Sequence, residues 1–278
     1  MRQPEIKKYP RTQHLEGSRL QPGDEDLESI PFRKIQGLTL VVEEKMDGAN
    51  CGFSFDDNGQ ILLQSRGHYL IGGVREKHFQ LFKKWAATHQ QAFWEVIGSR
   101  YIVYGEWLYA KHTIFYDALP HYFLEFDIYD RQTDNYLDTP SRYELLKTLP
   151  IASVPVLRTG SFRTLKDLTE LIDHSLYICD DHIEQMLQFC KKENIDQEIA
   201  LRETDLSVTA EGLYIKHEQE GHVIGRFKFV RSQFLQTAIT SGSHWLARPI
   251  IPNILARKFE DLFQPKLPMF SKESIETL

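Results

Sequence analysis

The chain has 278 residues, 41% of them hydrophobic and 26% charged, which is typical of a globular protein with one large core or two smaller ones. A formal net charge of −6 argues against a protein that coats nucleic acid without specificity, but it leaves room for a local basic groove. No run approaches the ~20 apolar residues that span a bilayer, the N-terminus lacks the apolar core of a signal peptide, and the three cysteines have no metal-site spacing. We therefore expect a cytoplasmic protein in a reducing compartment, with no membrane contact.

The first half of the chain changes from a polar lead-in to short strands. Residues 1–35 are polar and contain prolines, which predicts a loosely structured segment. The turn sequence Asp56-Asp57-Asn58-Gly59 predicts a hairpin between strands at residues 52–55 and 61–65. Aromatic and apolar residues spaced by three and four predict a helix over residues 73–97.

The second half of the chain inserts helices between strands. Two capping-box patterns, Ser141 with Glu144 and Thr164 with Asp167, predict helix starts within an insertion of about residues 141–200. Strands are expected on both sides of this insertion, at residues 101–109, 122–129, 207–217 and 222–230. The layout is α+β, because the chain lacks the regular strand–helix–strand alternation of a parallel doubly wound sheet.

A polar block interrupts a stretch that otherwise has the apolar character of a buried strand. Residues Lys45–Asn50, with the sequence Lys-Met-Asp-Gly-Ala-Asn, follow the apolar pair Val41-Val42 and precede phenylalanines at strand spacing. The block is either an exposed turn, in which Asp-Gly is common, or a site where Lys45 is placed to react.

Strand alternation gives a second indication of a site. Arg226 and Lys228 share one face of a predicted strand, while Phe227 and Phe229 share the other face, toward a core. Glu106 falls on an otherwise apolar face, where a carboxylate is either paired with a cation or bonded to a ligand.

Six short blocks follow one another between residues 40 and 231: Lys45–Asn50, Ser65–Gly67, Tyr104–Trp107, Phe123–Ile128, Ala210–Lys216 and Arg226–Phe229. In this order they resemble the motifs of the covalent nucleotidyltransferases, which include polynucleotide ligases and messenger-RNA capping enzymes. Asn50, where DNA ligases usually carry arginine, and the aromatic run Tyr122–Phe126 resemble the RNA ligases of the phage and kinetoplastid-editing type. One departure is Arg226, where the family usually has lysine.

The resemblance implies that Lys45 is the nucleophile and forms a lysyl-AMP intermediate. Its amine would attack the α-phosphate of ATP, form a phosphoramidate and expel pyrophosphate. A free lysine is almost fully protonated at pH 7, so we expect neighbouring cations and desolvation to lower its pKa. Arg66, Arg226 and Lys228 are candidates for that positive field, and Mg²⁺, with Mn²⁺ as a substitute, is the expected metal cofactor.

The resemblance also implies roles for the other matched positions. Phe126 would stack on the base, Glu106 would bond the ribose hydroxyls, and Glu44 would lie at the adenine edge. Glu211 would hold the metal ion, with Asn50 beside it through a water molecule. The full set of expected nucleotide contacts is Glu44, Asp47, Asn50, Arg66, Glu106, Phe126, Lys216, Arg226 and Lys228.

Several assignments have a structural alternative. Glu106 and Glu211 could form ordinary salt bridges, and Phe126 alternates with apolar residues, so it could be plain core. Lys216 would face away from Glu211 on a regular strand unless a bulge near Gly212 intervenes. Further candidate RNA contacts, with a solvated helix face and structural histidines as their alternatives, are Arg75, Lys77, Lys83, Lys84, Arg100, Lys111, His68, His112 and His121.

The implied architecture is a nucleotidyltransferase domain, ATP-grasp-like, of antiparallel sheets with flanking helices, plus a short helical C-terminal appendage. The expected divisions are a lead-in at residues 1–35, the adenylyltransferase domain at 36–231 with its helical insertion, and a C-terminal segment at 232–278 that begins with a helix over 233–240. That last segment is too short for the OB domain of ~100 residues that capping enzymes and many DNA ligases append.

The resulting hypothesis is an ATP-dependent RNA ligase of RNA repair, which adenylylates an RNA 5′-phosphate and seals it to a 3′-hydroxyl. A DNA ligase or guanylyltransferase would use the same lysine chemistry and is the first alternative. The second is a non-catalytic nucleotide- or RNA-binding protein on a ligase fold, which would form no covalent adduct. Since sealing requires RNA with 5′-phosphate and 3′-hydroxyl ends, a separate kinase–phosphatase end-healing enzyme is an expected partner.

Overall fold

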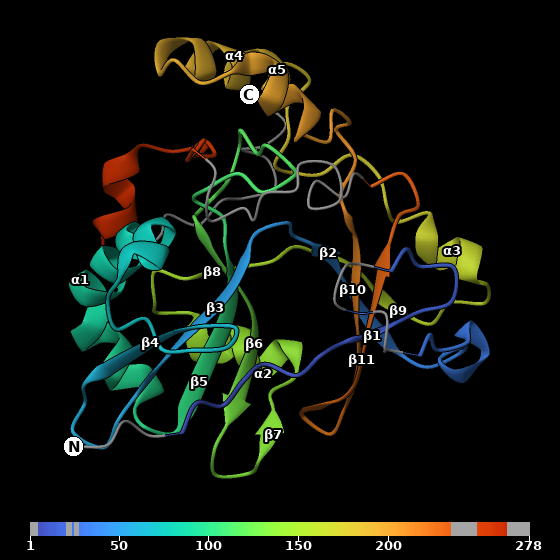
Figure 1. The fold of residues 1–278 in the computed structure, drawn as a ribbon. Helices are drawn as coiled ribbons and strands as arrows, with labels where there is room; N and C mark the ends of the chain where they lie inside the picture. Colours follow the sequence, from blue (N-terminus) through green and yellow to red (C-terminus); the bar gives the residue numbers. More distant parts are fainter. Residues whose placement is uncertain (1–4, 21–23, 25–27, 235–248, 266–278) are drawn as a thin grey trace.

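Two β-sheets meet in the computed structural model of the chain, which describes residues 5–20, 24, 28–234 and 249–265 (Figure 1). The first sheet has the strand order β1 (Gln13–His14), β11 (His222–Val230), β10 (Gly212–Gln219), β2 (Leu40–Lys45) and β9 (Val156–Gly160). The second sheet has the order β4 (Ile61–Ser65), β3 (Ala49–Phe55), β5 (Tyr101–Trp107), β6 (Phe123–Asp130) and β7 (Asn135–Tyr136), with β8 (Ala152–Ser153) added to β6. All pairings between these strands are antiparallel except β1 with β11 and β6 with β8.

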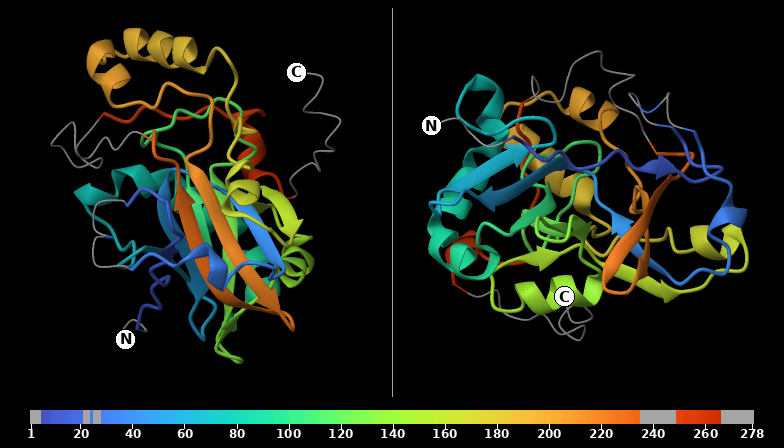
Figure 2. Two further views of the ribbon diagram at one scale, coloured as in Figure 1. Left: turned by 90° about the vertical axis from the view of Figure 1, so that its right-hand side faces the viewer. Right: turned by 90° about the horizontal axis from the view of Figure 1, so that it is seen from below.

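Helices flank the sheets and do not alternate regularly with strands. The α-helices are α1 (Gln80–Ile97), α2 (Thr139–Leu146), α3 (Leu165–Thr169), α4 (His182–Lys192) and α5 (Gln197–Arg202), and the 3₁₀ helices are η1 (Phe32–Lys34), η2 (Val74–Phe79) and η4 (Phe259–Phe263). Figures 1 and 2 show α1 against the second sheet, α3 beside the first, and α4 with α5 beyond the ends of the strands. The predicted α+β class is confirmed. Within the described ranges, no helix has the length and apolar character needed to cross a membrane.

Each sheet has an apolar face that packs a core. On the second sheet, Trp85 and Phe93 of α1 pack on Phe53 of β3 at ring distances of 6.3 and 4.8 Å, and Trp85 lies 5.2 Å from Phe123. The first sheet buries a separate cluster that includes Leu40, Val42, Leu213, Ile215, Phe162 and Leu168. Because the strands of the first sheet are amphipathic, the face opposite this apolar cluster is polar.

This polar face carries Lys45. Arg226 and Lys228 lie on the same face of the first sheet, whereas Phe227 and Phe229 pack with the apolar cluster behind it. The alternation predicted for this strand is therefore confirmed, and it brings three cations to one side of the sheet.

The chain passes from the first sheet to the second between Lys45 and Ala49. Gly48 occupies this connection, and a Cβ atom there would lie 2.8 Å from the backbone oxygen of Trp107 and 2.7 Å from the side chain of Leu108. Only glycine allows this close approach of two strands without a shift of the neighbouring backbone. The close contact holds the end of β2 against β5, where Glu106 lies.

The strands predicted at residues 101–109, 122–129 and 222–230 correspond to β5, β6 and β11, while the strand predicted at 207–217 begins only at Gly212, as β10. Three further predicted elements also agree with the structure. Strands β3 and β4 form the predicted hairpin, with Gly59 at φ 76° in its turn. Helices η2 and α1 together cover the predicted helix, and α3 begins with the predicted capping box of Thr164 and Asp167.

Other predictions are wrong in detail. Helix α2 begins at Thr139, because Asp138 caps it by accepting a hydrogen bond from the backbone N–H of Ser141, so Ser141 is not the cap. The insertion is not only helical, since it contributes β8 and the edge strand β9. Residues 1–35 are not loosely structured throughout: Leu15 and Ile35 are buried in the core of the first sheet. The division of the chain into domains stays a prediction.

The C-terminal segment is described only in part. Most of the helix predicted over residues 233–240 lies outside the described residues. Residues 249–265 contain η4 and pair back onto the main body through bridges of Pro252 with Ala110 and of Leu255 with Leu119.

A network of buried charges lies between the sheets and α2. Arg142 donates to Glu125 at 2.7 Å and to Glu43 at 2.6 Å, and all three side chains are fully buried. Two more cations belong to the network. Lys216 contacts Glu43 at 2.9 Å, and Arg226 donates to a third carboxylate, Asp127, at 2.9 Å. Three cations thus balance three carboxylates, so the network carries no net charge.

We predict that Arg142→Met lowers the free energy of unfolding by about 3–5 kcal/mol, because it leaves Glu43 and Glu125 buried without their cation. Urea denaturation measures this loss. The matched control is Arg163→Met, an exposed arginine, for which we expect a change within about 0.5 kcal/mol. A loss for Arg142→Met no larger than that of the control would contradict the prediction.

Candidate active site

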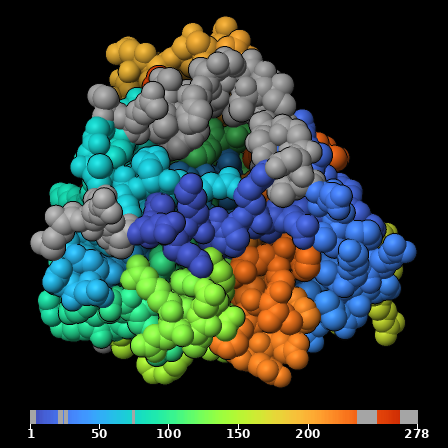
Figure 3. Space-filling model, turned by 60° about the horizontal axis from the view of Figure 1, so that its bottom comes forward, coloured from blue at the N-terminus to red at the C-terminus, as the bar shows by residue number. Residues whose placement is uncertain are grey.

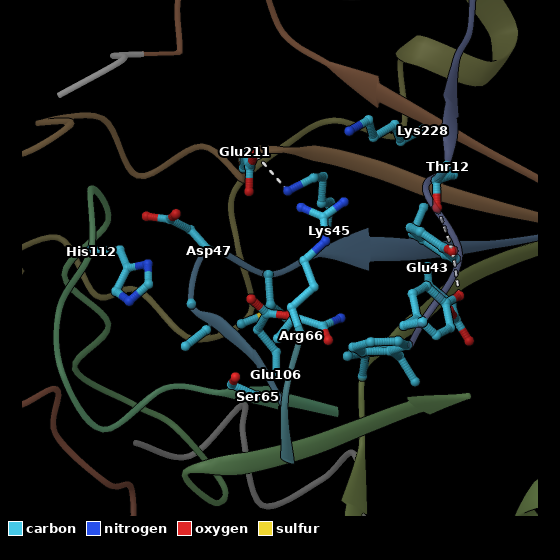
Figure 4. Close-up of a pocket in the computed structure, with 18 of the residues that line it drawn as sticks. Thr12, Glu43, Lys45, Asp47, Ser65, Arg66, Glu106, His112, Glu211 and Lys228 are labelled. Carbon is cyan, nitrogen blue, oxygen red and sulfur yellow. Dashed lines mark hydrogen bonds and ion pairs between the residues drawn. The ribbon is translucent and has the colours of Figure 1, made fainter. Parts of the chain in front are cut away.

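A cavity of about 790 Å³ lies between the two sheets, and most of the residues predicted from the motifs line it (Figure 4). Lys45 ends β2, Asn50 and Glu106 face each other across β3 and β5, and Glu211 directly precedes β10. The predicted residues that line the cavity are Glu44, Lys45, Asp47, Asn50, Arg66, Glu106, Phe126, Glu211 and Lys228. Lys216 and Arg226 are not part of its wall.

Lys45 lies against a carboxylate. Its Nζ atom is 2.6 Å from Oε1 of Glu211, and the two side chains are 19% and 1% exposed. Burial lowers the pKa of Lys45, but Glu211 and, more weakly, Glu106 and Asp47 outweigh burial and raise it above the usual lysine value. The expectation that surrounding cations lower this pKa is therefore wrong for the structure as it stands.

Lys228 is the cation that shares the cavity with Lys45. Burial lowers the pKa of Lys228, and the positive charge of Lys45 lowers it further, while an ion pair with Asp24 opposes the shift. Arg66 also lines the cavity, but its side chain is exposed. The positive field predicted from the motifs thus comes from one buried lysine and one peripheral arginine.

Asp47 holds the turn that follows Lys45. Its Oδ2 atom accepts hydrogen bonds from the backbone N–H groups of Thr113 and Ile114, each at 2.7 Å. Its own N–H donates to the hydroxyl of Tyr116 at 2.9 Å. These bonds tie the connection between β2 and β3 to the 113–116 loop, so Asp47 fixes the position of Lys45 in addition to lining the cavity.

Glu106 is the carboxylate that the sequence placed on an otherwise apolar face of a strand. Burial raises its pKa to about 8, although Lys45 and a hydrogen bond from the Gly48 backbone favour the charged form. The carboxylates of Glu211 and Asp47 add to the upward shift. Burial thus shifts Glu106 toward the protonated carboxylic acid, a form that can donate as well as accept a hydrogen bond.

A β-bulge aims Phe126 into the cavity. Gly105 pairs with Glu125 and Tyr104 pairs with Asp127, so Phe126 is an extra residue of β6. Phe126 lines the cavity while its neighbour Asp127 bonds Arg226 of the first sheet, so consecutive side chains both point toward that sheet. The simple alternation predicted for Phe126 is wrong, because the bulge interrupts it.

Lys216 and Arg226 act in the buried charge network. Lys216 pairs with Val41 on β2, four residues and about 13 Å from Lys45 along the strand. It donates to the backbone carbonyl of Phe126 and contacts Glu43. No bulge lies at Gly212, since the register of β10 shifts only between His217 and Glu218. Glu211 reaches Lys45 because it stands before the strand begins.

Arg226 is directed away from the cavity. Its guanidinium lies 3.8 Å from the centre of the Tyr136 ring and donates to Asp127. Direct contact of Arg226 with phosphate is therefore not supported, whereas Lys228 lines the cavity.

The three histidines separate into two groups. His121 is fully buried, burial lowers its pKa to about 3, and its Nδ1 accepts from the N–H of Phe123 at 2.9 Å, so it is structural. His68, whose ring contacts Ser65 at 3.0 Å, and His112 both line the cavity.

Most of the predicted basic RNA contacts among the described side chains have internal partners, including Lys84, which lies 5.2 Å from the centre of the Phe263 ring. Lys83 pairs with Glu76, Arg100 pairs with Asp130 at 2.6 Å, and Lys111 donates to the backbone carbonyl of Glu203 at 2.9 Å. A role of this stretch in binding RNA stays a prediction.

Sequence reasoning missed the N-terminal part of the cavity wall. Tyr9, Pro10 and Thr12 line the cavity, together with Tyr214 of β10. Nothing in the local pattern of residues 9–12 distinguishes them from a polar lead-in, because their contacts are made with residues far along the chain.

Comparison with known proteins shows the family to which the chain belongs. A family model described as RNA ligase matches residues 38–230, and the chain therefore belongs to the RNA ligase family. The matched range contains every motif residue that lines the cavity. A comparison with curated proteins found no match.

Among solved structures, the chain is similar to the RNA ligase of Naegleria gruberi. An aspartate-to-alanine variant in its apo form aligns with a TM-score of 0.50 at 18% identity, over 81% of this chain and 56% of that one. A lysine-to-alanine variant with ATP and Mn aligns with a TM-score of 0.49 at 19% identity, again over 81% and 56%. At this identity the first match shows a shared fold alone, and this chain spans just over half the length of the protein it matches.

Glu44 has an environment that makes stability depend on pH. Its side chain is 2% exposed, and Oε1 accepts from the hydroxyl of Ser175 at 2.5 Å. Burial raises the pKa of Glu44 to about 7, while the hydrogen bond from Ser175 favours the charged form and opposes the shift.

We predict that Glu44→Gln gains stability relative to the wild type as pH rises. The wild-type carboxyl binds its proton more tightly when folded, so its contribution is fully present below pH ~4.5 and is lost as pH rises to about 7. The free energy of unfolding of Glu44→Gln minus that of the wild type should therefore rise across that pH window and level off above it. Chemical denaturation at several pH values measures it, and parallel profiles would refute the assignment.

Proposed function

We propose that the protein is an ATP-dependent RNA ligase of RNA repair, in which Lys45 becomes adenylylated. The observation that carries this proposal is the convergence of Lys45, Glu211, Glu106 and Lys228 on one cavity, in a chain that belongs to the RNA ligase family. Structures of the similar N. gruberi enzyme with ATP and Mn support ATP and a divalent metal ion as its cofactors.

In the first step, the Lys45 amine attacks the α-phosphate of ATP and pyrophosphate leaves. Lys45 must lose a proton before it attacks, and the Glu211 carboxylate at 2.6 Å is in position to accept it. Lys228 would contact the phosphates, and Arg66 would approach them from the periphery.

The nucleoside would occupy the part of the cavity lined by the second sheet. Phe126 would stack on the base, and the Glu106 carboxyl would bond the ribose hydroxyls. Asp47 would act by holding the turn beside Lys45. Arg226 and Lys216 would act by fixing Asp127 and the backbone of Phe126, without touching phosphate.

The residues present suit a magnesium or manganese ion. Glu211 supplies a carboxylate and Asn50 an amide oxygen, and hard divalent cations prefer oxygen ligands. Bound there, the ion would neutralise charge that builds on the phosphates. A Glu211 side chain whose charge is neutralised would no longer hold the Lys45 ammonium, and the pKa of Lys45 would fall.

In the later steps, AMP would pass from Lys45 to an RNA 5′-phosphate, and an RNA 3′-hydroxyl would then displace AMP to join the strands. Sealing requires RNA ends that carry a 5′-phosphate and a 3′-hydroxyl, so we propose that a separate kinase–phosphatase produces these ends. The three cysteines, Cys51, Cys179 and Cys190, are free, which fits a reducing compartment such as the cytoplasm.

We predict that incubation with Mg²⁺ and ATP adds the mass of one AMP to the wild type and nothing to Lys45→Ala. Intact-mass spectrometry measures the adduct, after removal of any nucleotide carried from expression. Lys191→Ala, an exposed lysine of α4, is the matched control and should label as the wild type does. Labelling from GTP would favour a guanylyltransferase. The absence of an adduct with either nucleotide would favour the alternative of a non-catalytic nucleotide- or RNA-binding protein.

We also predict that the protein seals a nick flanked by RNA strands faster than the same nick flanked by DNA. The 3′-hydroxyl strand and the 5′-phosphate strand should be varied separately, and the products resolved on denaturing gels. Equal rates on all-DNA and all-RNA nicks would contradict the preference and support the DNA ligase alternative. Lys45→Ala provides the negative control for each substrate.

A further inference from the structure

The N-terminal segment from Lys7 to Leu15, here called the strap, joins the two sheets across the cavity. At one end the Lys7 carbonyl accepts hydrogen bonds from Tyr104 of β5 at 2.8 Å and from Gln64 of β4 at 3.0 Å. At the other end β1 pairs with β11, and the N–H of Leu15 donates to the carbonyl of Lys228 at 2.9 Å. Figure 3 shows this dark blue segment along the rim of a hollow in the surface.

Tyr9 is the strap residue that reaches the predicted base-binding ring. Its ring centre lies 5.0 Å from that of Phe126 at an interplanar angle of 76°, an edge-to-face contact. Its hydroxyl donates to Oδ2 of Asp127 at 2.5 Å and lies 2.5 Å from the hydroxyl of Tyr214. Tyr214 in turn contacts the hydroxyl of Thr12 at 3.0 Å.

These contacts hold the Tyr9 ring at both ends. The strap backbone is bound to both sheets, and the hydroxyl is bonded to Asp127, which belongs to the buried charge network. Tyr9 is 7% exposed and Phe126 is 9% exposed, so Phe126 is confined by Tyr9 on one side while part of it lines the cavity. A ring held in one orientation before binding loses less conformational freedom when a base stacks on it.

We infer that the strap is part of the nucleotide site and that Tyr9 is a positioning residue, which holds Phe126 in the orientation that stacks on a purine nucleoside. This inference rests on the proposed function, since that function assigns the base to Phe126. Tyr9 serves the nucleoside end of ATP. The phosphate end depends on Lys45 and Lys228 and not on the Tyr9 ring.

The competing explanation is a brace that only stabilises the fold. A brace predicts that loss of Tyr9 lowers stability and weakens every ligand alike. A positioning residue predicts a selective loss: binding of adenosine weakens, whereas binding of inorganic pyrophosphate does not. The affinities for adenosine and for pyrophosphate, measured separately, therefore distinguish the two explanations.

The test uses the full chain carrying Lys45→Ala, so that binding is measured without covalent labelling. Adenosine and pyrophosphate are titrated separately by calorimetry, and thermal unfolding is recorded for each protein. We expect Tyr9→Ala to weaken adenosine about tenfold or more, with pyrophosphate within about twofold. Tyr9→Phe keeps the ring and should give a smaller loss. Tyr101→Ala, at the end of β5 away from Glu106, is the matched control and should bind both ligands normally.

A double-mutant cycle tests whether Tyr9 acts through Phe126. If it does, adding Tyr9→Ala to Phe126→Ala should change adenosine affinity by less than about threefold, far less than Tyr9→Ala alone. Additive losses, equal weakening of both ligands, or unchanged adenosine binding in Tyr9→Ala would each overturn the inference, as would failure of the Lys45→Ala parent to bind adenosine. Labelling of the wild type by ATP judges the proposed function separately.

Discussion

The ion pair between Lys45 and Glu211 is the contact on which the rest of the site depends. It forms where β2 ends and β10 begins, because Gly212 lies directly opposite Lys45 in the ladder. A Cβ atom on Gly212 would lie 1.9 Å from the backbone oxygen of Phe229, so glycine is required for this close packing of β10 on β11. The pair holds the lysine as an ammonium ion, and an ammonium ion is not a nucleophile. Its chemistry therefore requires that the charge of Glu211 first be neutralised or used to take up a proton.

Two further constraints shape the cavity around this pair. The bonds from Asp47 to the 113–116 loop fix the turn after Lys45, and the neutral network of Arg142, Lys216 and Arg226 with three carboxylates fixes the opposite wall. The bulge in β6 links that network to the cavity, because it directs Phe126 into the cavity and Asp127 toward Arg226. The buried charges next to the bulge thus help to hold the Phe126 ring in position, since Lys216 also bonds the Phe126 carbonyl.

Much of the site could be predicted from the sequence because its chemistry needs particular residue types in a fixed local order. The Lys45–Asn50 block, the isolated charge of Glu106 and the alternation around Lys228 all depend on neighbours within a few residues. The role of Arg226 could not be predicted in this way, because it depends on Asp127, 99 residues away, and on a bulge that has no clear local signal. Tyr9 was missed for the same reason. The short helix α2 was misplaced by three residues, because Asp138 competed successfully with Ser141 as its cap.

Control of Lys45 by Glu211 can be tested by measuring the pKa of Lys45 by NMR of its labelled side chain, in the wild type and in Glu211→Gln, without nucleotide or metal. We expect the pKa of Lys45 to lie above the usual lysine value in the wild type and to fall clearly in Glu211→Gln, because burial then acts with less opposition. Lys83, whose partner is Glu76, provides an internal reference that the substitution should leave unchanged. A Lys45 pKa that is the same in both proteins would show that Glu211 does not control the protonation of Lys45.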